Sequence, residues 1–264
     1  MGTRISYSTN YRTTFSKSVV RETGLLDRLE GDTSDRVYLQ IHVRCGSAVG
    51  VETPIALEIA FGPEIDGDGA NERRPNFTAS TGQTQINFPK FTGAAWGLED
   101  CTVEWGDADI ETEGETTTVT APIDGWESTV RKPGVTDVAA ARSYSSTIVR
   151  AGDERAYNYA MLPMVAIERL GVSPGETAYV SLECFCLDGT PAFALERTSD
   201  DDDRPNVRKI TWSGPSNSQP RIAVGGLVTA LGVADVVLHL ETGESVGLSW
   251  FEHDDGLVGF VKSE

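Results

Sequence analysis

The sequence predicts a mainly β fold with short helices, built as two tandem copies of a β-barrel-like domain. Short runs that alternate apolar and polar residues recur along the chain, separated by turn residues, as in 178–182 after Ser173-Pro174-Gly175-Glu176. Matching segments also recur in the same order in both halves. Pro and Gly interrupt regular structure near Arg131-Lys132-Pro133-Gly134, so we place the domains at 1–132 and 133–264.

The internal repeat consists of colinear matches, which chance does not readily produce. The matched segments are Ser6-Tyr7-Ser8-Thr9 with 143–147, 37–41 with 178–182, Cys45 with Cys186, 53–58 with 190–196, Arg74-Pro75-Asn76 with Arg204-Pro205-Asn206, and 86–105 with 222–240. Further stretches at 102–120 and 245–261 are rich in Thr, Val, Trp and Gly and predict additional strands.

The charge balance is strongly acidic, with 22 basic and 40 acidic residues and a net charge of -18. Only five of the basic residues are Lys, and a Lys-poor acidic surface is typical of a salt-adapted protein, such as one from a halophilic archaeon or its virus or plasmid. An acidic protein from an ordinary environment is the alternative. Because the Debye length falls to about 3 Å at 1 M salt, the net charge does not by itself exclude a nucleic-acid partner.

The chain predicts a cytoplasmic protein without a membrane partner. Met1 is not followed by an apolar leader, and the longest apolar stretch, 223–240, contains Asp235, His239 and three glycines. Four cysteines in a chain of 264 residues do not indicate a disulfide scaffold.

One local motif is clear between Tyr157 and Glu183. It predicts a strand at 157–160, Pro163 before a short helix at 164–170, Gly171 as the helix stop, a tight turn at 173–176 and a second strand at 178–182.

This order of strand, Pro, short helix, Leu-Gly, acidic turn and strand resembles the swapped-hairpin unit of the AbrB family (SpoVT/AbrB and MazE-like proteins). Weaker forms recur, which gives candidate units at 11–44, 84–106, 155–185 and 219–241. In that family two units interlock into one small barrel, so the resemblance implies one barrel in each half of this chain. A duplicated β-rich domain unrelated to the family is the alternative.

The sequence contains no established catalytic motif, and we expect neither enzymatic activity nor a cofactor. His42 and His239 fall in predicted strands. His253-Asp254 could orient a general base, but a solvated turn near the end of the chain is the favoured interpretation.

No metal site is expected either. Cys184 and Cys186 share one face of a strand, and with Cys45 and Cys101 they could form a four-thiolate zinc site, but buried structural thiols are favoured. The acidic segment 66–72 lacks the residues that a calcium loop needs at its fifth and sixth positions, and together with 200–203 it predicts solvated connectors.

Basic residues near the first strand and helix of each unit are the candidate binding residues, because in the resembled family such positions contact DNA. They are Arg12, Lys17, Arg21, Lys90, Arg150, Arg155 and Arg221. Pairing with nearby carboxylates is the alternative. The leading hypothesis is a non-enzymatic DNA-binding regulator or a partition or antitoxin-like protein. A structural or assembly protein of a virus or plasmid system, made of duplicated β modules that self-associate or bind protein partners, belongs to a different class.

Overall fold

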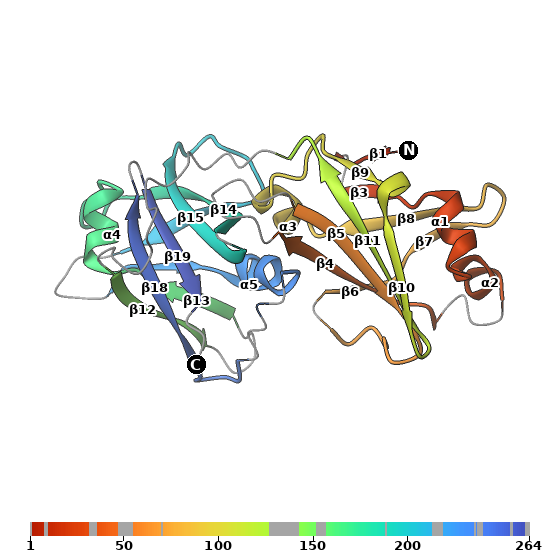
Figure 1. Ribbon diagram of the computed structural model, residues 1–264. Helices are drawn as coiled ribbons and strands as arrows, with labels where there is room; N and C mark the ends of the chain where they lie inside the picture. Colours follow the sequence, from red (N-terminus) through yellow and green to blue (C-terminus); the bar gives the residue numbers. More distant parts are fainter. Residues whose placement is uncertain are drawn as a thin grey trace.

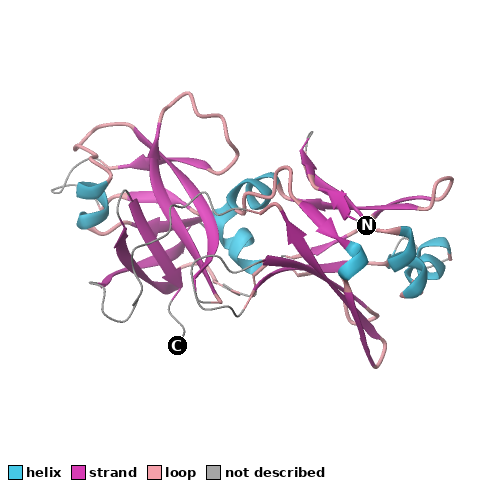
Figure 2. Cartoon of the chain, turned by 45° about the horizontal axis from the view of Figure 1, so that its top comes forward, coloured by secondary structure: helices cyan, strands magenta, loops and turns pink. Residues whose placement is uncertain are grey.

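The structure is a computed structural model, and it describes residues 2–7, 10–31, 36–46, 55–69, 71–126, 143–151, 157–187, 189–212, 219–234, 236, 240–253 and 256–261. The chain is mainly β with short helices, as predicted (Figures 1 and 2). Strands up to Asp124 form two open sheets, and strands from Ser143 onward form a closed barrel. The predicted junction at 131–134 lies outside the described residues.

The barrel of the second half contains eight strands, each hydrogen-bonded to its two neighbours. Trp250 and Phe193 are fully buried in its core and meet edge to face with ring centroids 5.2 Å apart. A sheet closed in this way has no terminal strand, although β12 pairs with β13 over only part of its length. In barrel order the strands are β12 (Ser143–Ala151), β13 (Tyr157–Met161), β17 (Arg221–Ala223), β16 (Val207–Thr211), β14 (Ala178–Leu187), β15 (Thr190–Thr198), β19 (Gly256–Val261) and β18 (Ser245–His253).

The local motif at 157–183 folds as predicted. Strand β13 ends at Met161, helix α4 (Met164–Arg169) follows Pro163, and Gly171 takes a positive φ of 60° at the helix end. A side chain would be strained at that φ, which is why glycine stands there. The N–H of Glu176 then donates to the carbonyl of Ser173 at 3.0 Å and closes the turn into β14.

Over its described residues the first half forms two open sheets, so the prediction of a barrel in this half is wrong. Its larger sheet has the order β1, β9, β11, β5, β4, β6, with β10 also paired to β11, and its smaller sheet has the order β2, β3, β8, β7. The two-residue β6 pairs with one edge of β4. Among the described strands, β7 pairs only with β8. These strands are β1 (Gly2–Arg4), β2 (Ser6–Tyr7), β3 (Tyr11–Thr14), β4 (Leu39–Cys45), β5 (Ile55–Phe61), β6 (Glu72–Arg73), β7 (Asn76–Thr78), β8 (Gln83–Phe88), β9 (Thr102–Glu104), β10 (Asp109–Glu113) and β11 (Thr116–Asp124).

Helix α1 (Lys17–Glu22) follows β3 as α4 follows β13, and Gly24 ends it with a φ of 68°. A second helix, α2 (Leu25–Glu30), occupies the extra residues that separate this unit from β4. Leu25 and Leu29 bury its apolar side, because they lie four residues apart and therefore on one face of the helix.

The two halves share a pattern of strand pairing. The antiparallel pairs β2·β3, β3·β8, β7·β8, β4·β5, β5·β11 and β10·β11 follow the same order along the chain as the barrel pairs β12·β13, β13·β17, β16·β17, β14·β15, β15·β19 and β18·β19. One hydrogen bond recurs at the same place: Phe15 N donates to Thr84 O, and Leu162 N donates to Pro220 O, each at 2.8 Å.

The halves meet through α3 (Lys90–Ala95) and α5 (Gly225–Gly232), which lie at the centre of the molecule (Figure 1). Trp96 is fully buried there, and its Nε1 donates to the carbonyl of Ala230 at 2.8 Å. Gly226 permits the close approach, because a Cβ at this position would lie 2.5 Å from the Phe91 ring. The contact is therefore tightly packed over both helices.

A disulfide joins Cys45 of β4 to Cys186 of β14 across this interface, so the expectation of free structural thiols is wrong for these two residues. The pair is 141 residues apart in the sequence, and only the docking of the two halves brings it together. Cys101 and Cys184 remain buried free thiols, as expected. Disulfides are commonest in oxidising compartments, so this one does not support the cytoplasmic location, which stays a prediction. In the described part of the chain, no helix is long and apolar enough to cross a membrane.

In the acidic connector 200–203, Asp200, Asp201 and Asp203 are exposed, as predicted, and Arg204 holds the half-buried Asp202. The Arg204 guanidinium donates to the Asp202 carboxylate, with Nη2 to Oδ2 at 2.8 Å, and Nη1 lies 3.3 Å from Oε1 of Glu183. Thr198 adds a hydrogen bond to Asp202 at 2.6 Å. The Arg204 and Thr198 donors hold the pKa of the Asp202 carboxyl well below its ordinary value.

Arg204→Ala is expected to weaken the acid dependence of stability. A depressed folded pKa stabilises the fold fully above the unfolded pKa of about 3.9, and this stabilisation is lost as the pH falls from there through the lower folded pKa. The variant should therefore lose less stability than the parent between neutral pH and acid in denaturant titrations. Arg12→Ala, which removes an exposed arginine that has no ion pair among the described residues, is the control. An equal acid dependence in all three proteins would contradict the role of Asp202.

Candidate nucleic-acid interface

The structure places six of the seven predicted cations, and Arg155 lies outside the described residues. Arg12 is on β3, Lys17 and Arg21 are one turn apart on α1, and Lys90 begins α3; all four are exposed. In the second half Arg221 begins β17 and is exposed, whereas Arg150 on β12 is half-buried.

These cations do not form one continuous rim. Helix α1 lies at the outer end of the first half, while α3 lies at the junction with the barrel (Figures 1 and 2). Lys17 and Arg21 are therefore well separated from Lys90. Arg221 belongs to the barrel wall, which gives separate basic positions along the molecule.

None of the six placed cations makes a side-chain hydrogen bond or ion pair with the part of the chain that the structure describes. The ion pairs found there use other arginines: Arg4 with Asp100, Arg44 with Glu58, Arg197 with Glu176, and Arg204 with Asp202 and Glu183. Pairing with carboxylates, the alternative to a binding role, therefore does not account for the six predicted cations.

A tyrosine platform, formed by Tyr157, Tyr159 and Arg221, lies on the outer face of the barrel. Tyr157 is 49% exposed, and its ring centroid is 5.8 Å from that of Tyr159. The Arg221 guanidinium carbon lies over the Tyr159 ring, 5.6 Å from its centroid. A cation above an aromatic face is attracted by the ring quadrupole, so Arg221 and Tyr159 support each other's position.

The alternation of β13 explains why the platform faces outward. Ala160 is buried and pairs with the buried Ile148, so its neighbours Tyr159 and Met161 lie on the opposite face of the sheet. Arg150 pairs with Asn158 and therefore shares the face of Ala160, away from the platform. Of the two predicted cations that the structure places in this half, Arg150 and Arg221, only Arg221 belongs to the platform.

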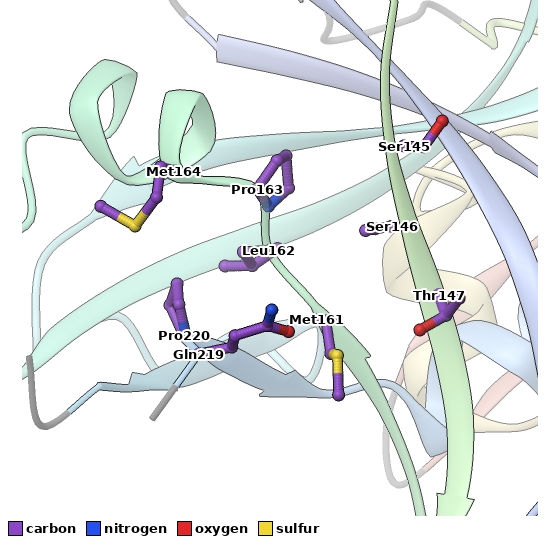
Figure 3. Close-up of a pocket in the computed structure, with 9 residues that line it drawn as sticks. All are labelled: Ser145, Ser146, Thr147, Met161, Leu162, Pro163, Met164, Gln219 and Pro220. Atoms are coloured by element: carbon purple, nitrogen blue, oxygen red, sulfur yellow. The ribbon is translucent and has the colours of Figure 1, made fainter. Parts of the chain in front are cut away.

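A pocket of about 590 Å³ opens beside the platform, where the barrel wall is incomplete (Figure 3). The pairing of β12 with β13 ends at Ile148 and Ala160, and Ser143 to Thr147 pair only with β18 among the described strands. The chain after Ala160 turns away into α4, which leaves the gap. The pocket is lined by Ser145, Ser146, Thr147, Met161, Leu162, Pro163, Met164, Gln219 and Pro220.

The pocket combines an apolar wall with hydrogen-bonding groups. Met161, Met164 and Pro220 supply apolar surface, and the Thr147 hydroxyl points from β12 toward the Met161 side (Figure 3). At the inner wall, Trp250 Nε1 donates to Ser146 Oγ at 2.6 Å. This mixture of apolar surface and a few polar groups is typical of small-ligand pockets.

In the first half, Trp105 lies at the end of β3. Its Nε1 donates to the carbonyl of Thr14 at 3.1 Å, and its ring stacks on Phe15 with centroids 4.6 Å apart. Trp105 and Phe15 are both buried, so this contact belongs to the core of the first half.

The sequence interpretation missed Tyr157 and Tyr159 as site residues. The signal was available, because the pattern Tyr157-Asn158-Tyr159 in a predicted strand puts both rings on one face. What it could not show is that this face points to solvent.

The remaining candidates for chemistry stay isolated. Burial raises the pKa of the Cys101 thiol to about 11, so it remains protonated and unreactive at neutral pH. Burial, together with Arg44, lowers the pKa of His42, which contacts Asn71. Over the described residues no group of three His, Cys, Asp or Glu side chains could hold a metal ion. His239 and Asp254 lie outside the described residues.

Comparison of this chain with protein-family models, curated proteins and solved structures found no match.

Proposed function

We propose that this chain is a non-enzymatic DNA-binding protein, a regulator or a partition or antitoxin-like factor built from two fused copies of one β-rich domain. The observation that carries the proposal is the state of the predicted contact residues. Arg12, Lys17, Arg21, Lys90 and Arg221 are exposed, and none of them is ion-paired within the described residues. In a protein with a net charge of -18, exposed cations in this state are available for phosphate.

The shared pairing pattern supports the fusion of two copies. Cys45 and Cys186 match in the sequence repeat and are bonded to each other. In a two-fold dimer, a residue contacts its own copy only on the symmetry axis. Helices α3 and α5 also belong to matching segments and pack on each other, so this contact too joins equivalent parts of the two halves. The interface therefore resembles that of a homodimer whose subunits were joined.

Arginine chemistry supports DNA as the ligand under high salt. Counterion release contributes less affinity as salt rises, so binding depends more on directional contacts. The planar guanidinium of Arg12 or Arg221 can donate two parallel hydrogen bonds to a phosphate or to a guanine edge.

A structural or assembly role is the second candidate, and exposed apolar side chains favour it. Tyr157 and Met164, 49% and 45% exposed, lie near the incomplete part of the barrel wall, where β12 has an edge without a described strand partner. A strand from a neighbouring copy could pair at such an edge.

The test is a mobility-shift titration of the full chain with duplex DNA fragments in KCl buffers of increasing concentration, with light scattering in parallel. Lys17→Ala with Arg21→Ala should weaken binding and reduce the slope of log affinity against log salt by about 0.9 for each phosphate that the variant no longer neutralises. Arg4→Ala is the matched control, because Arg4 is exposed but paired with Asp100. A defined large assembly with no shift for any fragment would favour the assembly role instead.

A further inference from the structure

We infer that the tyrosine platform and the adjoining pocket together bind single-stranded nucleic acid, with bases stacked on the tyrosines and one base edge in the pocket. The inference rests on the proposed function and names the form of nucleic acid that this surface accepts.

Stacking is the first argument. Tyr157 and Tyr159 stand two residues apart on one strand, and Tyr157 is 49% exposed. Their ring centroids are 5.8 Å apart, well above the spacing of about 3.4 Å between stacked bases in a duplex. The platform therefore matches bases that are pulled apart. Bases inside a duplex stack on each other and offer no free face, whereas an unpaired base can stack on an aromatic side chain.

Charge is the second argument. Arg221 begins the strand next to β13, pairs in register with Met161 and reaches back over the Tyr159 ring. It has no ion pair within the described residues, so its charge is available to the phosphate that joins two stacked bases. Aromatic rings beside a free cation are the combination used by proteins that bind single strands.

The pocket is the third argument, because it continues the platform. Met161 is two residues beyond Tyr159 on the same outward face, and it also lines the pocket. A nucleic-acid single strand lying along β13 would therefore reach the pocket after the two tyrosine rings. There Gln219 offers a carboxamide donor and acceptor and Thr147 a hydroxyl, the groups that hydrogen-bond a base edge, while Met164 and Pro220 cover its faces.

The experiment measures fluorescence anisotropy of labelled oligothymidine, with oligouridine and a duplex of equal length in separate arms, using the full chain in high-KCl buffer. Either single strand should bind more tightly than the duplex, and the oligouridine arm tells RNA from DNA. Tyr157→Ala and Tyr159→Ala should each weaken single-strand binding by about 5- to 150-fold, the equivalent of one stacked base.

Two further variants separate stacking from folding. Tyr157→Phe and Tyr159→Phe retain the ring and should retain affinity. Tyr7→Ala is the matched control, because Tyr7 is 41% exposed and paired with a tyrosine, yet that partner, Tyr11, is buried. This variant should bind like the parent.

Tighter binding of the duplex, or unchanged affinity in both alanine variants, would overturn this inference and leave the proposed DNA-binding function standing. Absence of binding to single strands and duplex alike would overturn both.

Discussion

Replacing Cys45 and Cys186 together with alanine is expected to lower the free energy of unfolding by about 5 kcal/mol, since the disulfide closes a loop of 141 residues. A cross-link over so long a loop removes much conformational freedom from the unfolded chain. Because the bond spans the interface, its loss should also let the two halves unfold separately, which would replace one unfolding transition with two.

Denaturant titration of the parent and the double variant, each with and without dithiothreitol, measures this effect. The reductant should destabilise the parent and leave the variant unchanged. Thiol titration of the unfolded parent should find two free thiols, those of Cys101 and Cys184, rather than four. Four thiols in oxidised protein, or equal stability of parent and variant, would contradict the cross-link.

Trp96→Ala is expected to destabilise the protein by about 3 to 5 kcal/mol, the usual cost of removing a fully buried large aromatic side chain. Trp96 ends α3, and its indole reaches α5 of the other half. Its own carbonyl also accepts a hydrogen bond from Trp126 at 2.7 Å. The cavity would therefore open in the interface itself. Calorimetry should then show the two halves unfolding in separate transitions.

Two phenylalanine substitutions test how much of this effect is hydrogen bonding. Trp96→Phe leaves the Ala230 carbonyl without its donor and should cost about 1 to 3 kcal/mol. Trp212 is also buried, but its Nε1 finds no acceptor among the described residues. Trp212→Phe should cost clearly less than Trp96→Phe, because it removes no hydrogen bond of that kind. Equal destabilisation in the two variants would show that the lost side-chain volume, and not the hydrogen bond, sets the cost of the substitution.

The sequence predicted local structure well, because local structure depends on neighbouring residues. Pro163 and Gly171 bracket a helix, and alternation in 178–182 marks a strand; both signals lie in the segment itself. In the second half β14 pairs with β16 and the barrel closes, whereas in the first half β4 pairs with β6 and the sheet stays open. No local sequence pattern predicts which of these pairings forms. The disulfide depends on docking of the two halves, so spacing alone gave no sign of it.

The candidate site was only partly accessible for the same reason. Arg221 was identified from its place at the start of a unit, and it lies on the platform. Tyr157 and Tyr159 were assigned to a strand, but their exposure depends on which side of β13 the barrel core occupies. The pocket arises where β12 and β13 part, a tertiary feature with no motif of its own.

The surroundings of Trp105 mark a difference between the two matching halves. Its indole hydrogen-bonds Thr14 and stacks on Phe15 at the end of β3, whereas the pocket of the second half opens at the end of β13. Within the described residues, the tyrosine platform and the adjoining pocket belong to the second half, so we expect one single-strand site in each chain. A titration with a short oligonucleotide should saturate at one equivalent. A single chain then holds one single strand on the platform, and bridging two single strands through this surface requires a second chain.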